Sequence, residues 1–197
     1  MKEKYSTILI WIIILFVLLL FSIGSYGQVN RNRIPDWIDF YKETLTFRCQ
    51  LEKVEVSGEY YFKNLTSSTL SFTVMFPFPV DEYHPFPDSI LVKNYSFQRK
   101  GKNIFWIMTL EPHEKVKFGV FYVQKSYDRQ FEYILNTVKE FWKRPITEFN
   151  TKIIFPKDWR TLKINYRYDA ESIKNSEIIL YMERRNFFPK ENIKISW

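Results

Sequence analysis

Few residues in this chain have the types and spacing that catalysis requires. The only histidines are His84 and His113, and neither stands beside a cysteine at zinc-ligand spacing. The sequence contains no Gly-x-Ser-x-Gly or Ser-x-x-Lys motif for a nucleophilic serine. Five dispersed glycines cannot build a phosphate-binding loop. We therefore expect no enzyme, no metal site and no cofactor.

Carboxylates are the remaining candidates for chemistry, since two of them across a cleft can hydrolyse a glycosidic bond. The acidic residues are scattered, however, and almost all stand at outward strand positions or in turns. That placement is typical of a solvated surface. A glycosidase is therefore an open but unsupported alternative.

The most distinctive stretch is residues 76–88, which hold four of the nine prolines together with four aromatic residues. Proline cannot donate to a strand ladder, so this stretch must leave the sheet or follow its edge. A stiffened loop loses little entropy on binding, which suits a recognition surface. Alternatively, Phe76 and Phe78 cap the core.

A second candidate is residues 141–146, where an aromatic side chain beside Lys143 and Arg144 could stack on a sugar or pair with an anion. The alternative is a tryptophan that covers the edge of the core. Together the two stretches give a candidate binding surface: Phe78, Tyr83, His84, Phe86, Trp142 and Arg144.

The N-terminus has the pattern of a targeting segment. Lys2 and Lys4 precede an unbroken apolar run over residues 8–21, and Ser25-Tyr26-Gly27 offers small residues for cleavage before Gln28. Residues 1–27 are therefore expected to be an apolar targeting helix, cleaved as a signal peptide or kept as an anchor. Both alternatives place residue 28 onward outside the cytoplasm, in the periplasm, on the envelope or secreted.

The rest of the chain is expected to be all-β. Residues 28–43 are polar and predict a lead-in arm, and strict alternation begins at Thr44. The short turn at residues 64–68 predicts an antiparallel hairpin between the strands on either side. Residues 131–142 fit a strand or a helical face. About ten strands with short connections favour an antiparallel β-sandwich over residues 44–197.

Net charge and cysteine content limit the expected partners and the expected means of stabilisation. The net charge of +7 comes from basic residues spread along the chain, which indicates a solvated surface. Nucleic acid is not expected as the partner of an exported protein. Cys49 is the only cysteine, so no disulfide can form within the chain. Alternation places Cys49 inward with Leu45, Phe47 and Leu51, as core rather than as a nucleophile.

One stretch carries a family resemblance. The strand at residues 58–64, its polar turn and the following strand that closes on Phe76-Pro77-Phe78-Pro79 resemble the start of vault/inter-alpha-trypsin domains. The later run of residues 110–116 is similar to a Leu-x-Pro-Gly-Glu turn, with His113 in place of glycine. The resemblance implies a β-sandwich without enzymatic activity that makes protein contacts.

Two functions remain as hypotheses. The first is a non-catalytic exported β-sandwich that serves protein interaction or envelope structure, with an unknown protein partner. The second is a carbohydrate-binding module whose glycan ligand stacks on exposed aromatics such as Tyr61, Tyr83, Phe86 and Trp142. In either case membrane contact is expected only through residues 1–27.

Overall fold

The alternating residues after Thr44 form the centre of the fold. The computed structural model describes residues 36–137, 142, 144–159 and 162–197. β1 (Ile38–Cys49) pairs antiparallel with β2 (Lys53–Asn64), and the inward side chains of both strands are buried. Cys49 is among them, which confirms its place in the core. Leu51 follows the end of β1 and is exposed, contrary to the expected alternation.

Eleven further strands follow in the described part of the chain. They are β3 (Leu70–Pro77), β4 (Ser89–Val92), β5 (Gln98–Lys100), β6 (Asn103–Leu110), β7 (Lys115–Lys125), β8 (Gln130–Tyr133), β9 (Ile146–Pro156), β10 (Lys163–Ile164), β11 (Ala170–Lys174), β12 (Glu177–Phe187) and β13 (Ile193–Ser196). The expectation of an all-β domain is confirmed.

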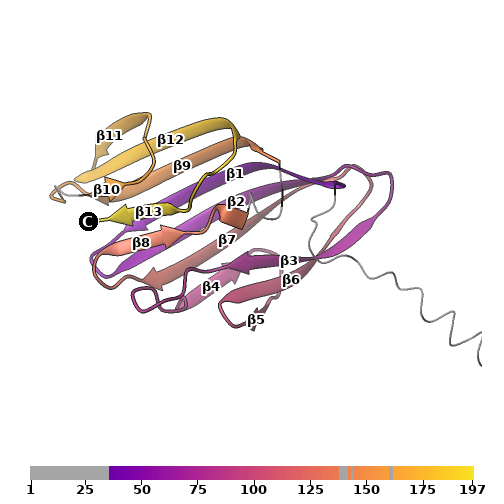
Figure 1. Ribbon diagram of the computed structural model, residues 1–197, viewed down its shortest axis with the longest axis horizontal. Coiled ribbons are helices and arrows are strands. Elements are labelled where there is room, and N and C mark those ends of the chain that lie inside the picture. The colour runs from indigo at the N-terminus through magenta and orange to yellow at the C-terminus, as the bar shows by residue number, and fades with distance from the viewer. Residues whose placement is uncertain (1–35, 138–141, 143, 160–161) are drawn as a thin grey trace, which may run out of the picture. The chain divides into compact units, whose positions relative to one another are not determined.

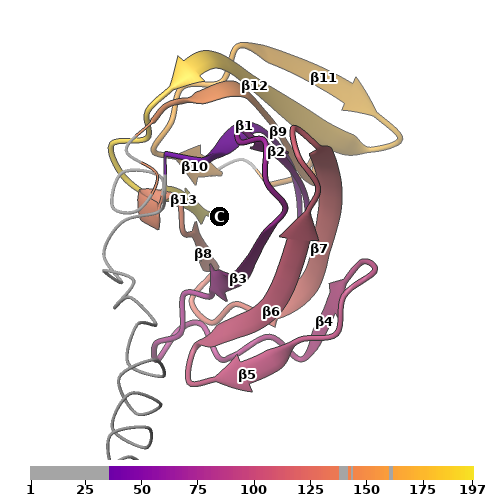
Figure 2. The same cartoon turned by 90° about the vertical axis from the view of Figure 1, so that its right-hand side faces the viewer.

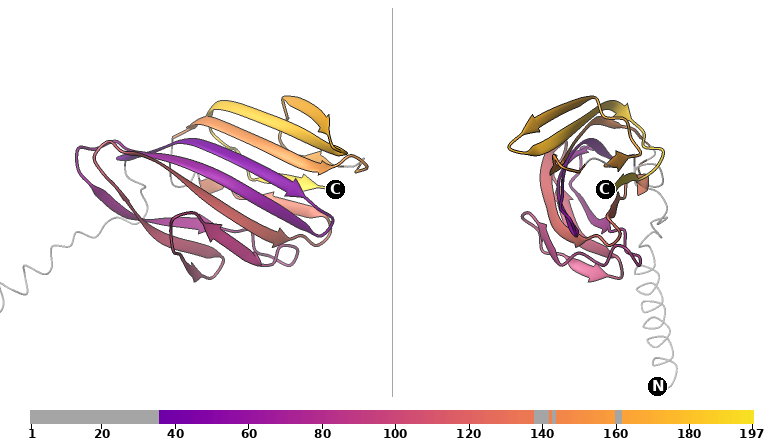
Figure 3. Two further views of the ribbon diagram at one scale, coloured as in Figure 1. Left: turned by 180° about the vertical axis from the view of Figure 1, so that it is seen from behind. Right: turned by 90° about the vertical axis from the view of Figure 1, so that its left-hand side faces the viewer.

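The strands form one large sheet and two small ones (Figure 1). The large sheet has the order β11-β12-β9-β1-β2-β7-β4, and the small sheets have the orders β10-β13-β8 and β3-β6-β5. From behind, the strands of the large sheet lie side by side (Figure 3). β1 and β9 pair in parallel. The expected purely antiparallel arrangement is therefore wrong at the centre of this sheet.

The hairpin expected across residues 64–68 does not form. β2 is paired on both edges, by β1 and β7, so β3 pairs with β6 in another sheet. The Asn64 side chain directs this change because it donates to the carbonyls of Ser68 (2.8 Å) and Glu111 (2.9 Å). It also accepts the N–H of Thr66 at 2.8 Å. The turn is thereby fixed to the β6–β7 connection rather than to a hairpin.

The large sheet is strongly curved, and β8, β10 and β13 lie inside its curve (Figure 2). Apolar side chains from the inner face of the large sheet meet those of both small sheets in a single core. Aromatic rings are prominent in it; Tyr60 stacks on Phe118, with ring centroids 5.2 Å apart. Burial on this scale stabilises the fold without a disulfide.

Three expectations concern the ends and joins of these elements. Residues 38–43, placed by the sequence in a lead-in arm, are part of β1. The segment 131–142 is divided: β8 ends at Tyr133, and Asn136 and Thr137 are helical. The targeting segment 1–27 lies outside the described residues. Within the described residues, no helix is long and apolar enough to cross a membrane.

Candidate functional site

The outer face of the small sheet β10-β13-β8 is a polar platform. Lys163, Ser196 and Gln130 stand opposite one another in one row across the three strands. Lys194 is opposite Glu132 in the next row, and its carbonyl accepts the N–H of Asn165. Since side chains two residues apart share one face, all six point the same way. The intervening residues Phe131, Ile193 and Ile195 face the core and are buried.

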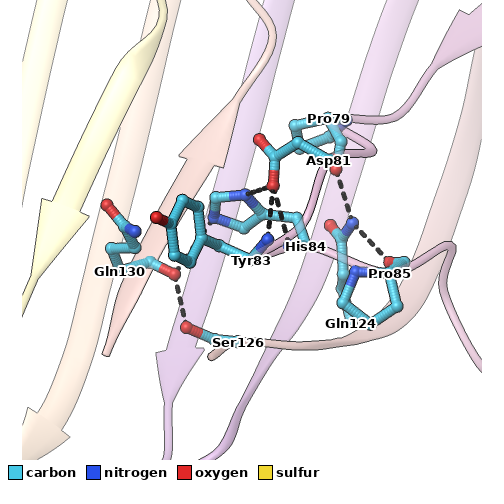
Figure 4. Close-up of polar contacts among 8 residues, drawn as sticks. All are labelled: Pro79, Asp81, Tyr83, His84, Pro85, Gln124, Ser126 and Gln130. Atoms are coloured by element: carbon cyan, nitrogen blue, oxygen red, sulfur yellow. Dashed lines mark hydrogen bonds and ion pairs between the residues drawn. The ribbon is translucent and has the colours of Figure 1, made fainter. Parts of the chain in front are cut away.

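The proline-rich loop of residues 79–85 stands beside this platform. Gln124 of β7 is fully buried, and its side-chain amide donates to the carbonyls of Pro79 (2.8 Å) and Pro85 (2.9 Å). Both ends of the loop are thus held by one side chain, as Figure 4 shows. Because proline fixes φ, the backbone is also restricted at Pro79 and Pro85 themselves, the two points that Gln124 holds.

Asp81 and His84 stabilise the loop through hydrogen bonds inside it. Asp81 accepts the backbone N–H groups of Tyr83 (2.9 Å) and His84 (2.8 Å) and lies 2.7 Å from His84 Nδ1. Partial burial opposes ionisation of Asp81, but its hydrogen bonds outweigh this and lower its pKa. His84 Nε2 lies 3.1 Å from the carbonyl of Gln130, which also accepts the hydroxyl of Ser126. The loop is therefore fixed to β8, and Tyr83 lies beside His84 and toward Gln130 (Figure 4).

Loop and platform together border an open cleft of about 490 Å³. Its carboxylates are already engaged: Asp81 by the loop, and Glu132 by the amide of Asn192 at 2.7 Å. Lys163 and Lys194 are exposed and form no ion pair with another described residue. The cleft can thus bind a polar ligand through lysine ammonium groups and the Tyr83 ring. Its lining is Asp81, Tyr83, His84, Gln130, Phe131, Glu132, Lys163, Ile164, Asn165, Lys194, Ile195 and Ser196.

The structure brings only part of the predicted surface to this cleft. Tyr83 and His84 line it, whereas Phe78 is fully buried and packs edge-on against Tyr122, with centroids 4.9 Å apart. The core interpretation of Phe78 is therefore the right one. Phe86 is half-buried, and the Arg99 guanidinium covers its ring at 3.5 Å.

The second predicted stretch lies elsewhere. Trp142 packs on the core, with its ring 5.0 Å from Phe62 and 5.5 Å from Phe40. Arg144 pairs with the carboxylate of Asp36 at 3.1 Å. Neither residue lines the cleft, so residues 142 and 144 do not join Tyr83 and His84 in one site.

A buried polar group was missed in the sequence. Glu43 lies in the core, where it accepts the hydroxyl of Tyr133 at 2.8 Å. Burial raises the pKa of Glu43 to about 8, although this hydrogen bond lowers it. The alternation of Leu45 and Phe47, extended backwards by one step, places residue 43 on the inward face. That extension was the available signal.

The platform residues were missed for another reason. Alternation around Ile164 and around Ile195 marks the flanking residues as outward. Ile164 and Ile195 are 31 positions apart, and no local pattern reveals that their segments pair. Cys49 lies in the core as predicted, and burial raises its pKa to about 12. Among the described residues, no group of three or more His, Cys, Asp or Glu could hold a metal ion.

Comparison with known proteins gives a likeness of fold. No family model and no curated protein matches the chain. A solved structure from Legionella pneumophila, described as a candidate nutrient-binding protein, matches 81% of this chain with a TM-score of 0.64 and 13% identity. An M1 zinc metallopeptidase from Deinococcus radiodurans bound to a Tyr-Ser-Ala substrate matches 81% of the chain, with a TM-score of 0.50 and 8% identity.

The chain spans 66% of the Legionella protein and 42% of the peptidase. At such identities the likeness shows the fold alone. The His-Glu-x-x-His zinc motif of metalloproteases does not occur in this sequence. The chain therefore shares a β architecture with domains of larger proteins, among them one described as a candidate for binding nutrients.

Proposed function

We propose that the domain is a non-catalytic binding module that acts outside the cytoplasm and binds a protein partner at the cleft beside Tyr83. The main support is that hydrogen bonds within the chain already fix the loop of residues 79–85 in the absence of a ligand. Gln124 holds both of its ends, Asp81 closes it, and His84 contacts the carbonyl of Gln130. A preformed loop binds with a small entropic cost.

The location is proposed from the targeting pattern of residues 1–27, with release or anchoring as its two forms. The sequence resemblance to vault/inter-alpha-trypsin domains favours protein contacts as well. The fold likeness to a candidate nutrient-binding protein is compatible with a binding role.

The carbohydrate hypothesis receives less support from the aromatic side chains on which it was based. A sugar platform needs exposed rings in one plane beside a groove. Trp142 packs on the core, Arg99 covers Phe86, and Tyr61 lies between Lys42 and Lys117 at 5.3 and 5.6 Å. Of the four aromatics proposed, only Tyr83 lines the cleft.

Site-specific photocrosslinking tests the proposal. A benzophenone amino acid placed at Tyr83 should capture a defined protein from envelope fractions of the source cells, and excess unmodified chain should compete with capture. Placement at Ile107 on β6, which is 70% exposed and does not line the cleft, is the matched control. Equal capture at both positions would contradict the proposal. Glycan-array binding that Tyr83→Ala abolishes would instead support the carbohydrate module.

A further inference from the structure

A second cleft, which together with the first we call the groove, borders residues 162–168. It has a volume of about 460 Å³ and shares Ile164 and Asn165 with the cleft beside Tyr83. One short segment therefore borders both clefts, and an elongated ligand could contact it along its length. The other residues that line the second cleft are Leu162, Tyr166, Arg167, Tyr168 and Leu180.

Positive charges outnumber negative charges along this groove. Lys163, Lys194 and Arg167 are exposed, and none forms an ion pair within the described ranges. Asp169 lies next to the groove, but Arg184 already neutralises it at 2.5 Å. Asp81 and Glu132 keep their negative charges although each already accepts a hydrogen bond, so Lys163, Lys194 and Arg167 exceed these two carboxylates by one positive charge. Charge complementarity therefore favours an acidic ligand.

The groove also contains a free strand edge. In the part of the chain that the structure describes, β10 is the edge strand of its sheet and pairs with β13 alone. The N–H of Asn165 donates to the carbonyl of Lys194 on β13. The N–H and C=O of Lys163, two residues earlier, therefore also point toward β13. Since successive residues of a strand direct these groups to opposite sides, the N–H and C=O of Ile164 point away from β13. An extended peptide could pair with them.

We propose that this groove binds an extended acidic segment of the partner protein, which adds as a strand to the free edge of β10. This inference rests on the proposed function and specifies its ligand. An added strand would lie about 4.8 Å from β10 and present every second side chain to the platform face. Acidic residues at alternate positions would then lie within reach of Lys163 and Lys194. A polysaccharide of the same charge lacks the backbone groups that pair with Ile164.

The direct test is a binding titration of the full chain with short synthetic probes. A labelled peptide of alternating Thr and Glu should bind, and the same peptide with Lys in place of Glu should not. Lys194→Glu and Arg167→Glu should each weaken binding about tenfold or more, a change typical of reversing one charge of a close pair. Lys100→Glu, an exposed substitution on β5, is the matched control and should leave binding unchanged.

Backbone pairing is tested from the ligand, so that the protein itself stays intact. Two peptides are compared, one N-methylated at the odd-numbered amides and the other at the even-numbered amides. Each lacks the hydrogen-bond donors of one edge, so only the peptide methylated on the edge that faces β10 should fail to bind. Equal binding of both methylated peptides would overturn strand addition. Tighter binding of an oligogalacturonate that Lys194→Glu abolishes would assign the groove to an acidic glycan.

Failure of every probe to bind would overturn the inference about the ligand. It would not contradict the proposed function, which photocrosslinking at Tyr83 tests separately, because capture there does not depend on the charge of the partner. Capture lost together with peptide binding would contradict both.

Discussion

The hydroxyl of Tyr133 donates a 2.8 Å hydrogen bond to Glu43, a residue 90 positions earlier in the chain. The hydroxyl of Tyr60 lies 2.7 Å from that of Tyr133 and extends the contact to a third strand. β1 and β2 of the large sheet are thereby connected to β8 of a small sheet through buried polar atoms. The second carboxylate oxygen of Glu43, Oε2, has no hydrogen-bond partner among the described residues.

Glu43 should make stability depend on pH. Its native pKa of about 8 lies above the ordinary value of 4.5, so the folded state holds the proton more tightly than the unfolded state. The contribution is complete below pH 4.5 and is lost as pH rises toward 8. At 1.36 kcal/mol per pKa unit, Glu43→Gln should become more stable than the native chain by on the order of 5 kcal/mol above pH 8.

Urea unfolding at pH 5, 7 and 9 measures this difference. The matched control is Glu52→Gln, since Glu52 is exposed and its substitution should give a curve parallel to that of the native chain. Parallel curves for Glu43→Gln and the native chain would show that the buried carboxyl does not hold its proton.

Gln124→Met should loosen the loop of residues 79–85. The thioether has a similar length but donates no hydrogen bond, so the carbonyls of Pro79 and Pro85 lose their partner. Loss of the unpaired Gln124 Oε1 offsets part of the cost, and we expect a destabilisation of about 2 kcal/mol. Hydrogen exchange should rise at Tyr83 and His84. Gln98→Met, on exposed β5, should change neither quantity.

Local alternation was a sound guide where a strand has one face in the core. It identified the inward positions of β1 and β2, among them Phe47 and Val56, because the period of two follows from strand geometry itself. It failed at Leu51, where β1 has already ended. Alternation also did not identify Glu43 as buried, because glutamate is a residue type normally expected on the surface.

Pairing between distant strands was beyond the reach of the sequence. The parallel contact of β1 with β9 joins Lys42 to Glu148, and no pattern within either strand specifies its neighbour. The hairpin expected after Asn64 failed for the same reason, since both edges of β2 were already taken. The cleft depends on such pairings, so only Tyr83 and His84, both on one distinctive loop, were found in advance.

His113→Gly should stabilise the chain. His113 has a φ of 57° in the turn between β6 and β7, a left-handed conformation that costs an L-residue about 1 kcal/mol and glycine nothing. Its backbone bond to Thr66 does not depend on the side chain. We expect a gain of about 0.5–1 kcal/mol by thermal unfolding. Asn175→Gly, at a φ of 50°, should gain less because asparagine tolerates this region. An unchanged or lower stability for His113→Gly would contradict this account.

Gly58 and Tyr60 should be energetically coupled. A Cβ atom at Gly58 would lie 2.6 Å from Cζ and 2.8 Å from Cε2 of the Tyr60 ring, closer than any ordinary contact. The ring cannot move away freely, because it stacks on Phe118 and its hydroxyl lies 2.7 Å from that of Tyr133. Gly58→Ala should therefore destabilise the native chain by about 2 kcal/mol.

A double-mutant cycle separates this clash from a general intolerance of alanine. In a Tyr60→Ala background the obstructing ring is absent, so Gly58→Ala should be neutral or stabilising, with a coupling energy of about 2 kcal/mol. Gly119→Ala, whose Cβ would have only ordinary contacts of 3.7 Å or more, should cost less than Gly58→Ala and show no such dependence on Tyr60. Additive effects of Gly58→Ala and Tyr60→Ala would mean that the ring does not occupy this space, and the approach of Tyr60 to Tyr133 and Glu43 would then need another explanation.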